Sequence, residues 1–119
     1  MIDIIDDDEA VRTALELLVR SYGWRARAYA SAQEYLEDPA QAAHAADCLL
    51  LDLNMPGMGG AELMERLAAR NVATPVIVVT GETRSPLAER ARRAGARAVL
   101  DKPFAEDELK SEIEALLTK

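Results

Sequence analysis

Four acids, one threonine and one lysine lie just after apolar segments of the sequence, where they can act together in one site. Asp6 to Asp8 follow the first apolar run, and Asp52, Thr80 and Lys102 follow three later ones. Carboxylates brought close together repel one another and raise one another's pKa unless a hard cation lies between them. A small, open set of oxygen ligands suits Mg²⁺ better than Ca²⁺.

The same residue types can also accept a phosphoryl group. A carboxylate can attack a phosphoryl group in line and form an acyl phosphate. We assign this attack to Asp52, with Lys102 and the cation neutralising the phosphoryl oxygens and Thr80 donating a hydrogen bond to one of them. The sequence therefore predicts Mg²⁺-dependent phosphoryl chemistry if the fold brings these side chains together.

The elements that must position these residues alternate between apolar runs and segments of helical periodicity. Each expected strand is followed by a helix, one of them at 61–70, with strands at 2–5, 25–29, 48–51, 75–80 and 97–100. The run from Val76 to Val79 is apolar on both faces, as a parallel strand between two helical layers must be. These units are too few for an eight-stranded barrel, so we predict an α/β fold with a doubly wound parallel sheet and ligands at the carboxyl ends of its strands.

Several expected helix ends carry recognisable signals. Gly23 and Gly95 are expected to end helices as left-handed caps. Ser31 lies three residues before a glutamate, which is the spacing of a capping box. Ser85 followed by Pro86 is typical of an N-cap and a first helical residue.

Composition limits the class of protein. The chain has 119 residues, 50% of them apolar, which is enough for one domain without disulfides. Its formal charge of −7 predicts no direct binding of nucleic acid by this domain. Cys48 lies in an apolar run and is expected to be buried, while the lone His44 is expected at the surface and not as a phosphoryl carrier. No signal peptide and no run of about 18 apolar residues occurs, so we expect a soluble, cytoplasmic protein without membrane contact.

Four segments of the sequence resemble the signature blocks of response-regulator receiver domains, the CheY-like domains of two-component systems. They are Asp6-Asp7, 52–60, 79–81 and 101–104, and the resemblance covers the whole chain. It implies one receiver domain over 1–119, no output domain in this chain, and a flavodoxin-like (βα)5 fold with strand order 2-1-3-4-5. The residues of the second and third blocks are most similar to those of receivers in nitrogen-fixation and LuxR-type regulators.

The resemblance implies a role for each matching residue. It makes Asp52 the phosphoacceptor and places Thr80 and Lys102 around it as switch and catalytic residues. The implied Mg²⁺ ligands are Asp7 directly, Asp6 through water, Asp52, and the backbone carbonyl of Asn54. Asn54 and Glu82 also resemble a pairing that modulates dephosphorylation by letting water reach the acyl phosphate.

The resemblance also implies partners. The donor would be a sensor histidine kinase or a phosphotransfer protein, and the chain would be a regulatory phosphoacceptor without separate substrate turnover. The new phosphoryl charge is expected to pull Thr80 and its loop toward the site. The change would then be read on the face formed by the fourth helix, the fifth strand and the fifth helix. An output domain, a downstream protein or, in a phosphorylation-dependent homodimer, a second copy would contact that face.

Val99 departs from the family pattern, because an aromatic residue commonly stands three positions before the lysine of the fifth strand. A β-branched valine is stiff at χ1 and cannot make the large rotameric swing of an aromatic side chain. We expect the signal to pass either by a shift of the backbone or through the helix that begins at Ser85. That helix offers only Leu87 and three alanines to the core, so we expect it to dock weakly and to be bistable.

Two other functions use the same residues. A Mg²⁺-dependent phosphohydrolase with an aspartyl nucleophile needs room for a substrate, and haloacid-dehalogenase-like enzymes place their Asp-x-Asp pair after the first core strand. Here Asp52-Leu53-Asn54 follows the third expected strand. A phosphorylation-independent interaction module is the remaining alternative, and the full acidic site speaks against it.

Overall fold

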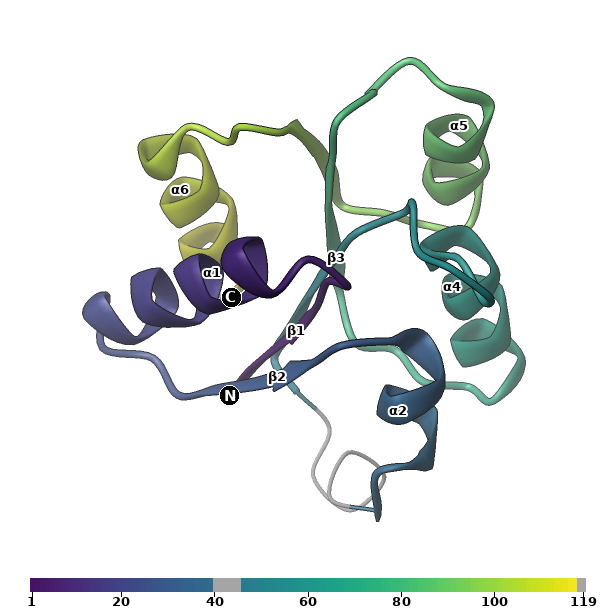
Figure 1. Cartoon of the computed structure of the whole chain (residues 1–119), viewed down its shortest axis with the longest axis horizontal. Coiled ribbons are helices and arrows are strands. Elements are labelled where there is room, and N and C mark those ends of the chain that lie inside the picture. The colour runs from purple at the N-terminus through teal and green to yellow at the C-terminus, as the bar shows by residue number, and fades with distance from the viewer. Residues whose placement is uncertain (40–45, 118–119) are drawn as a thin grey trace.

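The computed structural model describes residues 1–39 and 46–117, which form one parallel sheet flanked by helices (Figure 1). The strands run in the order β2-β1-β3-β4-β5, which confirms the predicted order. The strands are β1 Ile2–Ile5, β2 Ala26–Tyr29, β3 Cys48–Leu51, β4 Val76–Thr80 and β5 Ala98–Asp101. The helices are α1 Glu9–Ser21, α2 Ala32–Glu37, α4 Gly60–Ala69, α5 Pro86–Arg93 and α6 Glu106–Leu117. His44 lies outside the described residues.

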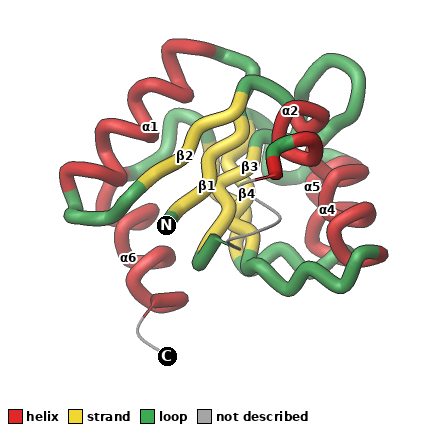
Figure 2. The backbone as a smooth tube through the Cα atoms, turned by 90° about the horizontal axis from the view of Figure 1, so that it is seen from below, coloured by secondary structure: helices red, strands yellow, loops and turns green. Residues whose placement is uncertain are grey.

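Helices cover both faces of the sheet, which confirms the doubly wound α/β fold. Helices α1 and α6 lie on one face, and α2, α4 and α5 lie on the other (Figure 1, Figure 2). Every residue of β3 and β4 is buried, and successive side chains enter opposite cores. Leu49 and Val78 pack in the core under α2, α4 and α5, whereas Leu50 and Ile77 pack in the core under α1 and α6. Among the described residues, no helix has the length and apolar character needed to cross a bilayer.

The helix ends follow the sequence signals. Gly23 and Gly95 have φ values of 92° and 102°, which are the left-handed conformations that glycine adopts without strain. The hydroxyls of Ser31 and Ser85 each accept a hydrogen bond at 3.0 Å from the backbone N–H three residues further on. Pro86 takes the first position of α5. These caps fix where α2 and α5 leave the strand ends.

Strands β1 and β3 have the predicted bounds, and the predicted ends of β2, β4, β5 and α4 differ from the structure by at most one residue. Helix α4 is displaced toward the N-terminus and spans Gly60–Ala69, because Gly59 rather than Gly60 is its N-cap. Strand β5 ends at Asp101, which pairs with Thr80 on β4. The Lys102 backbone N–H extends this pairing with a 2.8 Å bond to the carbonyl of Thr80. The last strand therefore reaches one residue closer to the site than predicted.

Helix α5 docks through its alanines but not through Leu87. Ala88 and Ala91 are fully buried, whereas Leu87 is 37% exposed. The expectation that Leu87 packs in the core is wrong, because residues three apart lie on one helix face and Ala88 with Ala91 define the inward one. An exposed ion pair from Arg90 to Glu65 also ties α5 to α4.

Cys48 is buried, as predicted, and the reactivity of its thiol can therefore report whether the protein is folded. The side chain is 0% exposed, and burial raises the pKa of its thiol to about 12, with Asp47 and Asp3 adding to the effect. Because the thiolate is the reactive form, we expect a thiol reagent at neutral pH to label the folded protein on the order of a thousandfold more slowly than the urea-unfolded chain. Equal labelling rates with and without urea would contradict this burial.

Candidate functional site

Three acids meet at the carboxyl ends of β1 and β3. Oxygen atoms of Asp6, Asp7 and Asp52 all lie within 4.8 Å of one another. Asp6 and Asp52 are buried, at 1% and 5% exposure, while Asp7 is exposed to solvent. The arrangement is a half-buried group of oxygen ligands that is open on the side of Asp7.

Strand register brings two of these acids together. Ile5 on β1 pairs with Leu51 on β3, so that Asp6 and Asp52 both follow paired residues. The backbone N–H of Asp52 donates to the carbonyl of Ile5 at 3.0 Å and continues the ladder into the site. The parallel sheet thus places side chains that are far apart in sequence at one edge.

The third acid of the triplet has a structural role. Asp8 is the N-cap of α1, and its carboxylate accepts hydrogen bonds from the backbone N–H groups of Ala10 at 2.9 Å and Val11 at 3.3 Å. The backbone N–H of Asp8 in turn donates to the Asp6 carboxylate at 2.9 Å. The acidic triplet therefore divides into one helix cap and two acids of the cluster.

Lys102 reaches the cluster from the end of β5. Its Nζ atom lies 2.8 Å from Asp6 Oδ2 and 3.5 Å from Asp52 Oδ1. Burial lowers the pKa of Lys102, but its hydrogen bond to Asp6 and the charges of Asp52 and Asp6 outweigh burial, so that its pKa is raised. Burial raises the pKa of Asp52, Lys102 opposes this, and Asp6 adds to it. The one ammonium therefore contacts two of the three carboxylates, and the cluster keeps an excess of negative charge.

Thr80 is fully buried at the end of β4, beside the cluster. Its hydroxyl accepts long contacts of 3.4 Å from the Asn54 side-chain amide and from the backbone N–H of Glu82. The backbone N–H of Asn54 also donates to Asp52 Oδ1 at 3.3 Å. Asn54 and Glu82 are both exposed at the rim. The structure thus brings all the predicted site residues except Val99 to one edge of the sheet.

Val99 lies on β5, opposite Val78 on β4, and is partly buried against the core under α2, α4 and α5. Val99 lies three residues before Lys102, and its side chain packs against the apolar residues of that core. The described structure gives it no polar contact with the site.

Gly60 allows α4 to begin directly against the end of β3. A Cβ atom at Gly60 would lie 2.5 Å from the backbone carbonyl oxygen of Asp52 and 3.0 Å from the Leu53 Cα atom. No larger residue fits there without a backbone shift. Gly60 in the second sequence block therefore permits α4 to pack close to Asp52.

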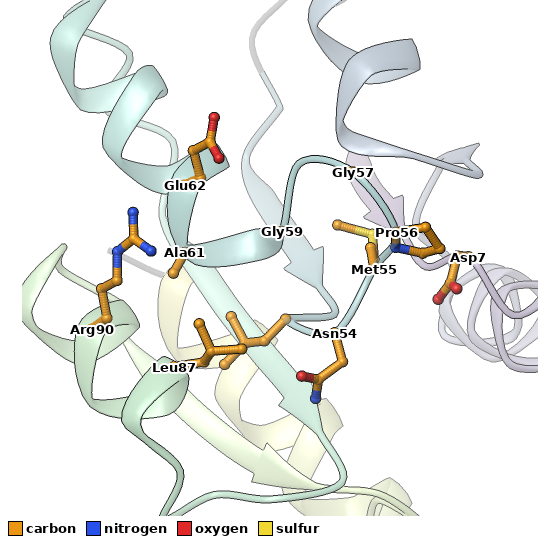
Figure 3. A pocket seen from close by; sticks show the side chains of 11 residues that line it. Asp7, Asn54, Met55, Pro56, Gly57, Gly59, Ala61, Glu62, Leu87 and Arg90 are labelled. Atoms are coloured by element: carbon orange, nitrogen blue, oxygen red, sulfur yellow. The ribbon is translucent and has the colours of Figure 1, made fainter.

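A pocket of about 610 Å³ opens beside the site, between the loop after β3 and the start of α5 (Figure 3). Asp7 lies at one end and Arg90 of α5 at the other, with Leu87 and Asn54 between them (Figure 3). Leu87 thus lies on the side of α5 that faces the loop that carries Asn54. A shift of α5 would change the shape of this pocket.

Sequence reasoning missed two polar contacts. Arg12 Nη1 donates to the backbone carbonyl of Asp6 at 2.8 Å. Asp3, within the first apolar run, is fully buried and forms an ion pair with Arg27 on β2. The only sequence signals were an arginine in the helix that follows the acids and an acid inside an apolar strand, and neither identifies a partner.

Comparison with known proteins identifies the family. Residues 2–114 match the response regulator receiver domain family. The chain is similar to response regulator protein TmoT of Ectopseudomonas mendocina, with 40% identity over 117 residues that cover 98% of this chain and 52% of TmoT. It is also similar to transcriptional regulatory protein FixJ of Bradyrhizobium diazoefficiens, with 36% identity over 114 residues that cover 96% of this chain and 55% of FixJ.

A solved structure agrees with both sequence matches. The crystal structure of FixJ-N superposes with a TM-score of 0.86 and 34% identity, covering 97% of this chain and 90% of that one. The chain belongs to the receiver domains of two-component response regulators. The predicted likeness to nitrogen-fixation regulators is confirmed by the two FixJ matches. The chain spans about half the length of the curated relatives described above.

Proposed function

We propose that Asp52 is the phosphoacceptor of this receiver domain. The observation that supports this most directly is the position of Asp52 at the end of a central strand, with Lys102 Nζ at 3.5 Å and two further acids in the same cluster. Burial and the neighbouring acids raise the pKa of Asp52, because they disfavour its charged form. A cation bound at the cluster would stabilise the carboxylate that attacks the phosphoryl group. Receiver domains are regulatory, and we expect no separate substrate turnover.

The acidic cluster fits the Mg²⁺ that receiver domains use in general. All its donors are oxygen atoms, which is the ligand type that Mg²⁺ prefers. Both Asp6 oxygens accept hydrogen bonds, from Lys102 and from the Asp8 N–H, which suits an indirect contact through water. We propose Asp7 and Asp52 as direct ligands, together with the backbone carbonyl of Asn54. When bound, Mg²⁺ would supply the positive charge that the cluster and the phosphoryl oxygens lack.

The transfer step needs few groups. A carboxylate oxygen of Asp52 forms a bond to the phosphorus atom, while the bond to the donor breaks and its electron pair leaves with the donor. The Lys102 ammonium is placed to neutralise the phosphoryl oxygens, and the Thr80 hydroxyl to donate a hydrogen bond to one of them. Positioning and charge neutralisation provide the acceleration.

The donor is proposed to be a sensor histidine kinase or a phosphotransfer protein. An apolar pocket of about 460 Å³ lies directly beside Lys102, lined by Ala10 and Ala14 of α1 and by Pro103 and Phe104. Leu17, further along α1, is 65% exposed. An apolar surface next to a phosphoryl site supports docking of a protein donor there.

The output is proposed to pass through the face of α5, β5 and α6. The pull of the phosphoryl group on Thr80 would reach α5 through the loop after β4, and the Leu87 pocket would change with it. Because Val99 cannot swing like an aromatic side chain, α5 itself is the proposed moving element. An output domain or a downstream protein would bind this face.

A phosphorylation-dependent homodimer through the same face is the other proposed assembly. The last turn of α5 is basic and the first turn of α6 is acidic, so that two copies could pair with opposite charges facing each other. The basic residues are Arg90, Arg92 and Arg93, and the acidic residues are Glu106, Asp107 and Glu108.

The experiment that tests this function is intact-mass analysis after incubation with Mg²⁺ and a small acyl phosphate, with EDTA as the control. We expect one labile phosphoryl adduct per chain with Mg²⁺ and none with EDTA. Continuous release of phosphate from a small phosphate ester would instead support the phosphohydrolase. Partner binding that is the same with and without the donor, in the absence of any adduct, would support the passive interaction module.

Asn54 and Glu82 are proposed to set the lifetime of the acyl phosphate. Both are exposed at the rim beside Thr80, where they can orient an attacking water. Replacing both with alanine is expected to slow the decay of the phosphorylated protein about tenfold, equivalent to ~1.4 kcal/mol in activation free energy. Glu89→Ala removes an exposed acid of α5 and serves as the control. An unchanged decay rate in the double variant would remove this role.

A further inference from the structure

Arg12 makes a contact that none of the proposed roles uses. It lies in the second turn of α1 and is partly buried, and its Nη1 atom donates to the backbone carbonyl of Asp6 at 2.8 Å. That carbonyl belongs to the peptide group that links Asp6 to Asp7. Among the salt bridges of residues 1–39 and 46–117, none includes Arg12. The guanidinium is therefore directed at the backbone between Asp6 and Asp7.

The two acids that share this peptide group differ in how they are held. The Asp6 carboxylate is bound by Lys102 on one oxygen and by the Asp8 N–H on the other. Asp7 is exposed, and its side chain makes no hydrogen bond within the described part of the chain. Its direction thus depends on the backbone that carries it. Because a peptide group is planar, a bond to the Asp6 carbonyl also fixes the plane that leads to the Asp7 Cα atom.

We propose that Arg12 is a positioning residue that orients Asp7 for Mg²⁺ binding. The inference rests on the proposed Mg²⁺ site. It assigns Arg12 no contact with the ion and no part in phosphoryl transfer. Groups that orient a metal ligand from behind commonly change metal affinity by about tenfold or more when they are removed.

The charge of Arg12 has the opposite effect on the same measurement. A cation close to the acidic cluster repels Mg²⁺, so that removing its charge alone would tighten Mg²⁺ binding. Removing its hold on the Asp6–Asp7 peptide would weaken binding. The sign of the change in affinity therefore separates positioning from simple electrostatics.

The test is calorimetric titration of Mg²⁺ into unphosphorylated wild-type protein, Arg12→Met, Arg12→Lys and Arg20→Met. Arg20 is a matched control on the same helix, because it also donates to a backbone carbonyl, that of Ala26 at 3.3 Å, and pairs with an acid, Glu16. We expect Mg²⁺ affinity to fall about tenfold in Arg12→Met and to be unchanged in Arg20→Met. Arg12→Lys keeps the charge but shortens the reach, so its expected loss of several-fold reports position alone.

Thermal unfolding in EDTA shows which variants are folded, and Arg12→Lys decides the question if Arg12→Met is not. Affinity that stays the same or increases in Arg12→Met, or that stays at the wild-type level in Arg12→Lys, would overturn the inference while leaving the Mg²⁺ site intact. Absence of Mg²⁺ binding by wild-type protein would overturn both the inference and the metal site on which it rests.

Discussion

Replacing Asp52 with asparagine is expected to abolish phosphoryl uptake and, in EDTA, to make the protein more stable near neutral pH. Uptake fails because an amide cannot form the acyl phosphate. Stability rises because asparagine has nearly the same shape but carries no buried charge beside Asp6 and Asp7. Intact mass after incubation with an acyl phosphate reports the first effect, and urea unfolding reports the second. Asp101→Asn, an exposed acid at the end of β5, should change neither.

The pH dependence of this stability difference has a defined sign. Burial raises the pKa of Asp52 in the folded protein, so that the folded state holds its proton to a higher pH than the unfolded chain does. Relative to the asparagine variant, the wild type should lose stability as pH rises through the raised pKa. The difference in stability between the two proteins should vanish below the pKa that the Asp52 carboxyl has in the unfolded chain. A wild type that gains stability over the variant as pH rises would contradict the direction of the shift.

Breaking the buried ion pair between Asp3 and Arg27 is expected to be the most damaging change to stability. Asp3 is 0% and Arg27 18% exposed, and two bonds join them, Nε to Oδ1 at 2.8 Å and Nη2 to Oδ2 at 3.1 Å. Arg27→Met leaves an unpaired carboxylate inside the sheet and should cost about 3–5 kcal/mol of unfolding free energy.

Two further variants make the measurement specific to the buried charge. Combining Arg27→Met with Asp3→Leu removes both charges and should restore much of the stability, because an apolar pair replaces an ionic one. Arg66→Met breaks the exposed pair with Glu62 and should cost less than about 1 kcal/mol. Urea unfolding curves provide all these values. A loss below 1 kcal/mol in Arg27→Met would show that the Asp3 carboxylate does not depend on this partner.

The position of the site was predictable because parallel strands bring their carboxyl ends to one edge. Asp52 and Lys102 each follow an apolar run that the alternating pattern predicts as a parallel strand, so that the topology places both at that edge. The two roles within the triplet Asp6 to Asp8 were harder to separate. An acid before a helix suits a cap as well as a metal site, and only the hydrogen bonds of Asp8 to the start of α1 distinguish them.

Other contacts could not be predicted because their partners are set by three-dimensional packing. Asp3 finds Arg27 through the register of β1 and β2, which the hydrophobic pattern alone does not fix. Arg12 binds a backbone carbonyl, and every residue offers one of those. Leu87 looked like a core residue by its type, but its exposure depends on which face of α5 turns inward. Each miss concerns the direction of a side chain rather than the presence of an element.

The measurement that tests the central claim most directly is chemical trapping of the phosphorylated residue. Borohydride reduces an acyl phosphate to an alcohol, so that the aspartate that carried the phosphoryl group becomes a homoserine residue that peptide mass spectrometry can locate. After incubation with Mg²⁺ and an acyl phosphate, the account predicts reduction at Asp52 alone, and none in the EDTA control. Reduction at Asp6 or Asp7, or a phosphoryl group found on His44, would contradict it.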